Sequence, residues 1–372
     1  MAERRFGVGI VGLQPGRSWA ARAHIPALQA LADDFEIIGV ANTSKASAEE
    51  AAAASGIKQA FADVAELVAS PEVDIVTVTM KVPQHLEIVT AALEAGKHVY
   101  CEWPLGNGLA EAEQMAALAK AKGVFGVVGT QARVAPEIEY LHKLVADGYA
   151  GEVLSSTLVG RAGGWGASIA DRKTGSYLLD RANGATMLTI PLGHTLAALR
   201  DVLGDISELS ALLANRRNSV VALDTGETLS MNAPDQVLVS GILESGAPVS
   251  IHYRGGGPRG AVGLVWEING TEGDIRVSGP SGHAQMVQLA LEGGRGDDRE
   301  MRPLEVPAAY RAGWPDNPVI GNVARIYARM AVDLRDGTRT APAFDDAVEL
   351  HRLIDAIEAA ADEGQRVSPQ FF

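Results

Sequence analysis

Cysteine is almost absent from this sequence, since Cys101 is the only one in 372 residues. A single cysteine excludes an internal disulfide framework and is typical of a reducing compartment. The sequence also lacks an apolar run of about 18 residues, the length that a membrane-spanning helix needs, and its first residues show no secretory signal. We therefore expect a cytoplasmic protein with no membrane partner.

Positive charge is scarce as well: 32 lysines and arginines stand against 46 aspartates and glutamates, a net charge of −14. Such a charge repels the phosphates of nucleic acids, and no basic patch is evident, so we expect no direct nucleic acid binding. The eight histidines are scattered and follow neither a Cys-x-x-Cys nor a His-Glu-x-x-His spacing. The sequence thus predicts no metal site.

Short apolar segments alternate with helical patterns over the first third of the chain. Ser47 with Glu50 and Asp63 with Glu66 each predict a capping box at the start of a helix. The segments that predict buried strands are FGVGIVG, EIIGVAN, DIVTVTM, HVYCE and VFGVVGT. This alternation predicts an α/β fold, a Rossmann-type doubly wound parallel sheet with helices on both faces.

The pattern changes after about residue 150, where strand segments follow one another with short turns. Asn269-Gly270 is a hairpin signal between two of them, and a helix is predicted over 184–203. The strand segments are EVLSSTLVG, ISELSALL, DQVLVSGILESG, PVSIHYRGG, VGLVWEING and DIRVSG, and two further helical patterns follow near the end. We predict an α+β domain with a large open, mainly antiparallel sheet.

Two domains follow from this change of pattern: a dinucleotide-binding domain over 1–132 and a substrate and oligomerisation domain over 133–372. The helical patterns near the end of the chain are compatible with packing back on the first domain. We expect the functional site between the two domains, where ligand sites are common.

The turn after the first strand has part of a dinucleotide-binding pattern. A dinucleotide site needs glycines here, so that backbone amides and a helix N-terminus can approach the pyrophosphate. The strict G-x-G-x-x-G pattern is absent, but Gly12 and Gly16 are present and a small alanine follows. Arg17 is either a phosphate contact or a solvated loop residue. The cofactor-binding residues predicted in this turn are Gly12, Leu13, Gly16, Arg17, Ser18 and Trp19.

The second strand ends in the segment ANTSK, without the acidic residue that binds the ribose 2′-hydroxyl of NAD. Asn42, Ser44 and Lys45 offer hydrogen-bond donors and a positive charge instead, which favours the 2′-phosphate of NADP over NAD. The alternative is that Ser44 or Ser47 only caps the next helix, with Lys45 in solvent.

These segments, in this order, resemble the Gfo/Idh/MocA family of glucose–fructose oxidoreductases and inositol dehydrogenases. The resemblance covers nearly the whole chain and is carried by HLEIVTAALEAGKHVYCEWPL, GYAGEV, GHTLAALRDVLG and INGTEGDIRV. Within the family it is strongest toward the branch of the fungal galactose-pathway repressor, through SWAARAH, CEWPL, RAGGWG and GHTLAAL. The resemblance implies the fold and a nicotinamide dinucleotide site, whereas activity has to be argued at the site.

Two polar groups of the family's catalytic site are missing from this chain. The resemblance implies a histidine at His194, a lysine at the position of Trp103 and an aspartate at the position of Ile190. His194 remains a candidate acid/base, because imidazole titrates near neutral pH; the alternative is a core histidine bonded to a backbone carbonyl. An indole is neither a base nor a cation, but it can stack on a nicotinamide or a sugar ring.

Other residues could complete the site. Lys81, at the end of a predicted strand, is a candidate replacement for the missing cation, with an exposed loop lysine as the alternative. Tyr177 is a second polar group, and we take both with His194 as catalytic candidates. Near the cofactor we also predict Met80, His85, Glu102, Trp103 and Pro104, where Glu102 would orient the loop and Pro104 would fix its backbone. The predicted substrate-binding residues are Trp165, Asp180 and Asn183, with a helix or turn cap as the alternative for Asp180.

The function expected from these residues is NAD(P)-dependent oxidoreduction of a sugar, a cyclitol or a sugar derivative. The alternative is a non-catalytic sensor that binds the dinucleotide and acts through a protein partner, because Trp103 and Ile190 have replaced polar groups. The resemblance further implies a homodimer or homotetramer formed through the large sheet.

Overall fold

The structure is a computed structural model that describes residues 4–371, and the chain divides into two compact units. Unit 1 comprises Met1–Gln131 and Gly313–Glu349, and unit 2 comprises Ala132–Ala312 and Leu350–Phe372. The third boundary, between Glu349 and Leu350, falls inside helix α10, which spans Phe344–Glu363.

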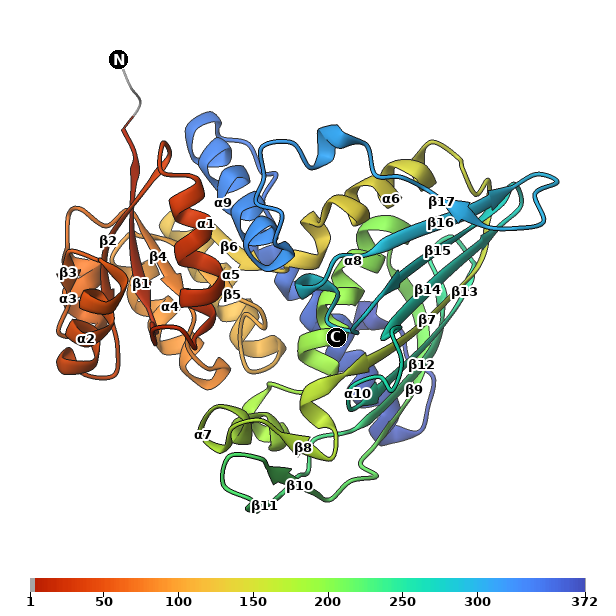
Figure 1. The fold of residues 1–372 in the computed structure, drawn as a ribbon, viewed down its shortest axis with the longest axis horizontal. Helices are drawn as coiled ribbons and strands as arrows, with labels where there is room; N and C mark the ends of the chain where they lie inside the picture. Colours follow the sequence, from red (N-terminus) through yellow and green to blue (C-terminus); the bar gives the residue numbers. More distant parts are fainter. Residues whose placement is uncertain (1–3, 372) are drawn as a thin grey trace. The chain divides into compact units, whose positions relative to one another are not determined.

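Unit 1 is built on a six-stranded parallel sheet with the strand order β3-β2-β1-β4-β5-β6 (Figure 1). The order reverses between β1 and β4, which is the switch point where doubly wound sheets bind ligands. The strands are β1 (Phe6–Val11), β2 (Phe35–Ala41), β3 (Gln59–Ala60), β4 (Ile75–Val78), β5 (His98–Glu102) and β6 (Gly126–Gly129). The predicted Rossmann-type sheet is confirmed; only β3 was not predicted, because two residues carry no pattern.

The helices of unit 1 connect these strands. A π-helical turn over Ala20–His24 runs directly into α1 (Ile25–Ala30), against which α9 packs. The remaining helices are α2 (Lys45–Ser55), α3 (Val64–Ala69), α4 (His85–Glu94), α5 (Leu109–Lys122) and α9 (Pro318–Asp336).

The two predicted capping boxes have different outcomes. The Asp63 carboxylate accepts a hydrogen bond from the Glu66 N–H at 2.8 Å and caps α3 as predicted. The prediction for Ser47 with Glu50 is wrong, because α2 begins earlier and its N-cap is Ser44, whose hydroxyl accepts from the Ser47 N–H at 3.2 Å.

Unit 2 contains an eight-stranded sheet with the order β17-β16-β15-β14-β7-β13-β12-β9. Every neighbouring pair is antiparallel except β13 with β7, which confirms the predicted mainly antiparallel sheet. Its strands are β7 (Val153–Ala162), β9 (Ile206–Ala214), β12 (Gln236–Leu243), β13 (Pro248–Gly255), β14 (Leu264–Gly270), β15 (Gly273–Gly279), β16 (Ala290–Arg295) and β17 (Arg302–Pro303). A small sheet adds β8 (Ser168–Ile169), β10 (Ser219–Ala222) and β11 (Thr228–Ser230).

The predicted hairpin between β14 and β15 is present, but Asn269-Gly270 is not its turn. Asn269 pairs with Asp274, and Gly270 pairs with Val153 of β7, so both residues belong to the strand. The turn is therefore made by the residues after Gly270, and pairing with a third strand has extended β14 beyond the local signal.

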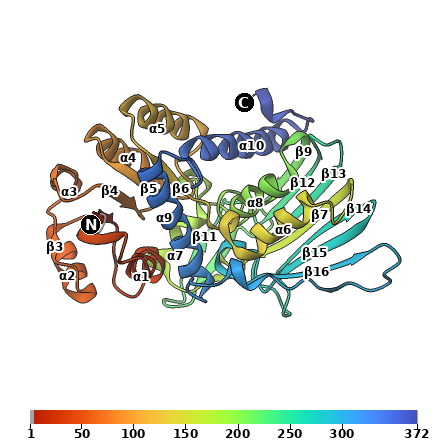
Figure 2. The ribbon, with the colours of Figure 1, turned by 90° about the horizontal axis from the view of Figure 1, so that it is seen from above.

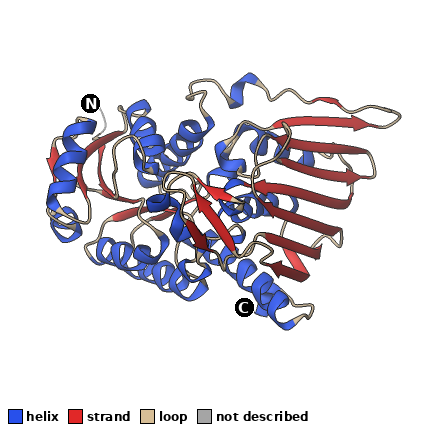
Figure 3. Ribbon diagram, turned by 60° about the horizontal axis from the view of Figure 1, so that its bottom comes forward, coloured by secondary structure: helices blue, strands red, loops and turns tan. Residues whose placement is uncertain are grey.

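Burial alternates along most of β12 and β13, as expected for a sheet with one packed face and one open face. Figure 2 shows α6 (Pro136–Ala146) and α8 (Gly193–Leu203) against one face of the sheet. Figure 3 shows the strands of the sheet in red. The short α7 spans Arg172–Gly175.

The helix predicted over 184–203 is regular only from Gly193 onward. A π-helical turn over Leu188–Leu192 precedes α8, and it contains Pro191, which has no N–H for a regular helical hydrogen bond. The Thr189 hydroxyl, from within this turn, donates to the Gly184 carbonyl at 2.7 Å and accepts from the Thr186 N–H at 2.8 Å. The threonine side chains thus replace helical bonds in the first part of the predicted range.

Candidate functional site

In the turn after β1, neighbouring atoms lie so close to the backbone of Gly12 that a side chain would not fit there. Gly12 has φ = 103°, and a Cβ atom there would lie 2.6 Å from Met80 Sδ. Gly16 has φ = 69° with no atom within 4 Å of a Cβ position, so one side of the turn is open. The Ser18 hydroxyl closes the turn, since it accepts from the Gln14 N–H at 2.9 Å and lies 3.1 Å from the Gln14 carbonyl. The two predicted glycines therefore both occupy conformations that favour glycine.

The end of this turn offers an unsatisfied donor. Trp19 Nε1 is buried and has no hydrogen-bond partner among the described residues, and the helical segment that leads into α1 starts directly after it. Arg17 is exposed in the same turn. A buried indole N–H, a helix start and open glycine backbone fit the pyrophosphate of a dinucleotide. The residues that would hold it are Gly12, Gly16, Arg17 and Trp19.

Asn42 supports the turn rather than pointing out of it. Its Oδ1 accepts from the Leu13 N–H at 2.8 Å, and its Nδ2 donates to the carbonyls of Leu13 and Ser47 at 2.9 and 3.0 Å. Both protons of the amide are used, and Ser44 is the cap of α2. Lys45, the third residue predicted to meet the ribose 2′-position, is exposed at the start of α2.

Replacing Gly12 by alanine is expected to weaken dinucleotide binding at least about tenfold, or about 1.4 kcal/mol. The reason is that a Cβ would displace Met80 and strain a backbone at φ = 103°. Fluorescence titration of NADH and NADPH would measure it. Gly56→Ala is the matched control, because Gly56 has φ = 66° with open space around it at the end of α2. Unchanged affinity in Gly12→Ala would contradict the assignment of this turn.

The loops after β4 and β5 are joined by His85. Its Nδ1 lies 2.9 Å from the Pro104 carbonyl and its Nε2 lies 3.0 Å from the Met80 carbonyl. Burial lowers the pKa of His85, against the opposing effect of these carbonyls. The Trp103–Pro104 peptide bond is cis. His85 thus connects Pro104 to Met80, which in turn contacts Gly12, so that the predicted cofactor residues form one connected edge of the sheet.

Glu102 leads a buried hydrogen-bonded chain. Its carboxylate accepts from Gln131 Nε2 at 2.8 and 2.9 Å and lies 2.8 Å from His24 Nε2. His24 Nδ1 lies 2.8 Å from the Tyr327 hydroxyl, which lies 2.8 Å from the Thr77 hydroxyl. This chain holds the end of β5 in place. Sequence reasoning missed His24, Gln131 and Tyr327, because they are far from Glu102 in the chain and carry no spacing signal.

Two other predicted residues of unit 1 differ in exposure. Trp103 is buried, with 5% of its surface exposed, so the family's lysine is replaced by a packed indole. Lys81 is exposed and is the N-cap residue of a short turn that follows β4. Lys81 therefore lies at the carboxyl end of a central strand, as predicted.

His194 is the second residue of α8 in unit 2 and is 3% exposed. Burial, and then the neighbouring His283, lower the pKa of His194 to about 3. Its Nδ1 has no hydrogen-bond partner among the described residues, so this nitrogen does not make the carbonyl bond considered as the alternative. At neutral pH His194 is a buried, uncharged imidazole whose Nδ1 is buried and has no partner among the described residues.

The predicted substrate-binding residues are held within unit 2. Trp165 is 1% exposed, and its Nε1 donates to the Leu178 carbonyl at 2.9 Å. Asp180 is an N-cap that accepts from the Ala182 N–H at 3.1 Å, which is the capping alternative; its hydrogen bond to Asn232 lowers its pKa. Substrate contacts of these side chains stay predictions.

The other two predicted residues of this segment, Tyr177 and Asn183, are hydrogen-bonded to each other. Asn183 Nδ2 donates to the Tyr177 carbonyl at 2.8 Å. Tyr177 is partly buried, and burial raises its pKa. The phenol is therefore protonated at neutral pH and can act as a hydrogen-bond donor.

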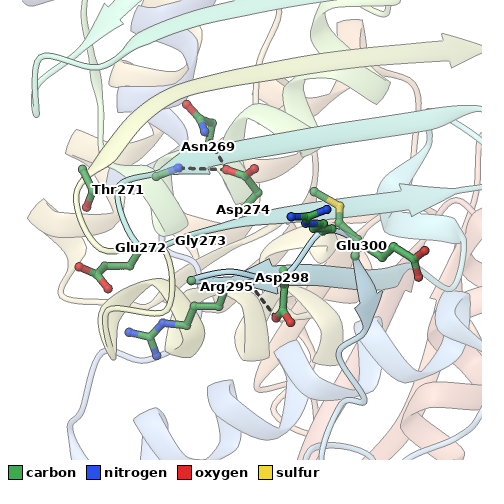
Figure 4. A pocket seen from close by; sticks show the side chains of 13 residues that line it. Asn269, Thr271, Glu272, Gly273, Asp274, Arg295, Asp298 and Glu300 are labelled. Atoms are coloured by element: carbon green, nitrogen blue, oxygen red, sulfur yellow. Dashed lines mark hydrogen bonds between the residues drawn. The ribbon is translucent and has the colours of Figure 1, made fainter.

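A separate pocket of about 440 Å³ lies at the hairpin ends of the large sheet (Figure 4). Asn269 Nδ2 donates to Asp274 at 2.7 Å, and Asp298 accepts from the Arg295 N–H at 3.1 Å. Its lining carries both signs of charge and includes none of the predicted site residues.

Two features are absent from the described part of the chain, residues 4–371. Across these residues, no three or more His, Cys, Asp or Glu side chains are grouped so as to hold a metal ion. No helix in this range combines the length and the apolar character needed to cross a bilayer.

Two family profiles match the chain in succession. The profile described as "Oxidoreductase family, NAD-binding Rossmann fold" matches residues 6–130, and the profile described as "Gal80p, C-terminal domain" matches residues 136–279.

Three relatives span most of the chain. Dehydrogenase aclE of Aspergillus oryzae is 30% identical over 99% of this chain and 99% of its own length. The galactose/lactose metabolism regulatory protein GAL80 of Kluyveromyces lactis is 27% identical over 96% of this chain and 93% of its own. Levoglucosan dehydrogenase of Pseudarthrobacter phenanthrenivorans is 25% identical over 89% of both chains. The crystal structure of the transcriptional regulator Gal80p from Kluyveromyces lactis superimposes with a TM-score of 0.88 at 28% identity, covering 99% of this chain and 95% of the other.

Proposed function

This chain belongs to the Gfo/Idh/MocA family of oxidoreductases with an NAD-binding Rossmann fold, and we propose that it transfers hydride between a nicotinamide dinucleotide and a CH–OH group of a sugar, a cyclitol or a sugar derivative. Two full-length relatives are named as dehydrogenases, one of them for levoglucosan, an anhydrosugar. When bound, the nicotinamide supplies the hydride acceptor or donor, and the protein has to supply binding, orientation and proton transfer.

His194 is the observation that carries this proposal. A neutral imidazole with an unpartnered Nδ1 can accept the proton that leaves the substrate hydroxyl. Its pKa of about 3 makes it a weak base in the unliganded protein, so a second polar group is needed. Lys81 and Tyr177 are the candidates, Lys81 as a cation and Tyr177 as a protonated donor.

The test of this function is absorbance in the reduced-nicotinamide band during incubation with a panel of sugars and cyclitols. Steady, enzyme-dependent conversion of at least one of them supports the oxidoreductase. Cofactor binding without conversion across the whole panel would reject it.

We propose NADP as the preferred cofactor, because the end of β2 has no acidic side chain and Lys45 is exposed at the start of α2. Lys45→Glu is expected to lower NADPH affinity about tenfold, since a carboxylate would repel the 2′-phosphate, and to leave NADH affinity within about twofold. Titration of both cofactors measures this change in ratio. Tighter NADH than NADPH binding by the unsubstituted chain would contradict the preference.

The second candidate function is a dinucleotide-binding sensor that acts through a protein partner. The specific observation in its favour is that Trp103 is buried where the family has a catalytic lysine, while Ile190 stands where the family has an aspartate. A full-length relative is named as a regulatory protein. The absorbance assay separates the two functions, because a sensor binds the cofactor tightly and converts nothing.

A homodimer or homotetramer through the open face of the large sheet is part of the proposal. Leu212 and Leu238 pair across β9 and β12, and they are 56% and 36% exposed. We expect this assembly in the cytoplasm, on the evidence that the one cysteine is a buried free thiol.

A further inference from the structure

His283 lies beside His194, although nothing in the sequence pairs them. It precedes the short 3₁₀ turn η8 (Ala284–Met286), which packs on α8, and its proximity contributes to the lowered pKa of His194. His283 is partly exposed, while its Nδ1 is buried and has no hydrogen-bond partner among the described residues. Unit 2 therefore contains two neighbouring imidazoles, each with a buried and unpartnered Nδ1.

Tyr253 fixes the segments that carry the two histidines. Its hydroxyl lies 2.7 Å from the Thr195 hydroxyl, one residue after His194, and 3.0 Å from the Gly282 carbonyl, one residue before His283. Tyr253 has no exposed surface, and its ring fits because residue 160 is glycine: a Cβ there would lie 2.3 Å from the ring. One buried phenol thus bridges the two segments.

The orientation of the His283 ring is fixed by an aromatic neighbour, Trp165. Its ring stacks on Trp165 with centroids 6.4 Å apart and planes at 19°. The backbone of Trp165 lies directly on β13, since a Cβ on Gly255 would lie 2.1 Å from the Trp165 carbonyl oxygen. Gly282 is fixed as well, because its N–H donates to the Arg161 carbonyl at 2.8 Å. The imidazole of His283 is therefore positioned from two directions rather than mobile in a loop.

We propose that His283 is a second substrate-binding residue, which with His194 forms a site for adjacent hydroxyl groups of an uncharged polyol. This inference rests on the proposed function and narrows its substrate class. Each neutral imidazole offers one donor and one acceptor, and each hydroxyl of a polyol also donates and accepts. The two imidazoles stand on segments that the Tyr253 hydroxyl joins, and each could bind one of two neighbouring hydroxyls.

We choose uncharged polyols as the substrate class because His194 and His283 are both uncharged. Burial lowers the pKa of His283 to about 4 and that of His194 to about 3, so neither carries charge at neutral pH. A carboxylate or phosphate bound against these two neutral, largely desolvated rings would lose hydration and gain no countercharge from either ring. Neutral sugars and cyclitols should therefore bind more tightly than uronic acids of the same shape.

The experiment is calorimetric binding of D-glucose, D-galactose, myo-inositol and D-glucuronate to the full chain with saturating NADPH, which cannot accept a hydride from a polyol. At least one neutral polyol is expected to bind, and D-glucuronate is expected to bind at least about tenfold more weakly than D-glucose. His283→Phe keeps a flat ring against Trp165 but removes both nitrogens, and it should raise the Kd of the bound polyol at least about tenfold. His142→Phe, at an exposed histidine of α6, is the matched control and should leave the Kd unchanged.

Binding is measured separately from turnover, so the two proposals can fail separately. Polyol binding that depends on His283 without any conversion would support this inference and reject the oxidoreductase. Conversion with unchanged Kd and KM in His283→Phe would reject this inference alone. It would also be overturned if no neutral polyol binds, or if D-glucuronate binds as tightly as D-glucose. If His283→Phe does not fold, judged by thermal melting, His283→Leu provides the same comparison with a smaller side chain that also has no hydrogen-bonding group.

Discussion

Replacing His194 by alanine is expected to lower kcat for the best substrate by roughly two to four orders of magnitude, the usual contribution of a general acid or base. The loss should fall on kcat more than on dinucleotide affinity, because His194 belongs to unit 2 and the glycine turn belongs to unit 1. Steady-state kinetics and cofactor titration on the same preparation measure both quantities.

The matched control for this prediction is His142→Ala, which removes an exposed imidazole from α6 in the same unit. It should keep kcat within about twofold, as expected of a surface substitution. Near-normal turnover in His194→Ala would remove His194 from the mechanism, and Lys81 and Tyr177 would then be tested in the same way.

Acidification is expected to destabilise unit 2 strongly between neutral pH and pH 5. Burial lowers the pKa of both His194 and His351 to about 3, from an ordinary value of 6.5. Below 6.5 the unfolded chain binds protons that the folded chain excludes, so stability falls as the pH falls toward 3. Each such histidine should cost about 2 kcal/mol at pH 5, a sizeable part of a typical total of about 5–15 kcal/mol.

Urea unfolding at pH 7.5 and pH 5.0 measures this effect as the difference in free energy of unfolding. In His351→Asn that difference should shrink by about 2 kcal/mol, whatever the variant's absolute stability, because one proton-linked group is gone. His142→Asn should keep the full difference, since this side chain is exposed. Equal stability at the two pH values would show that the buried imidazoles are not excluded from protonation.

The strands and helices were predictable where a local pattern is enough to specify them. β1, β2 and β4–β6 are short apolar runs bounded by turn residues, and Asp63 caps α3 through contacts three residues away. The predictions of element boundaries were wrong where a distant strand or a neighbouring residue competes with the local sequence signal. β14 extends through Gly270 because β7 pairs with it, and Ser44 rather than Ser47 caps α2.

The candidate site was only partly predictable for the same reason. Gly12, Gly16 and His194 could be singled out from a turn pattern and from a family resemblance. His283, Tyr253 and His24 could not, because their partners lie far away in the chain and no spacing connects them. Asn42 was selected for its polar group, yet the fold uses that group to support Leu13.

The amino-acid sequence alone determined the Rossmann-type sheet, the open second sheet and the glycine turn, because periodicity, turn chemistry and backbone freedom act between near neighbours. Only the tertiary structure decided which histidines stand together and whether they carry charge. Burial and side-chain pairing depend on what the rest of the chain brings to a position: Tyr253 brings the segments of His194 and His283 together, and the surrounding core keeps both rings neutral.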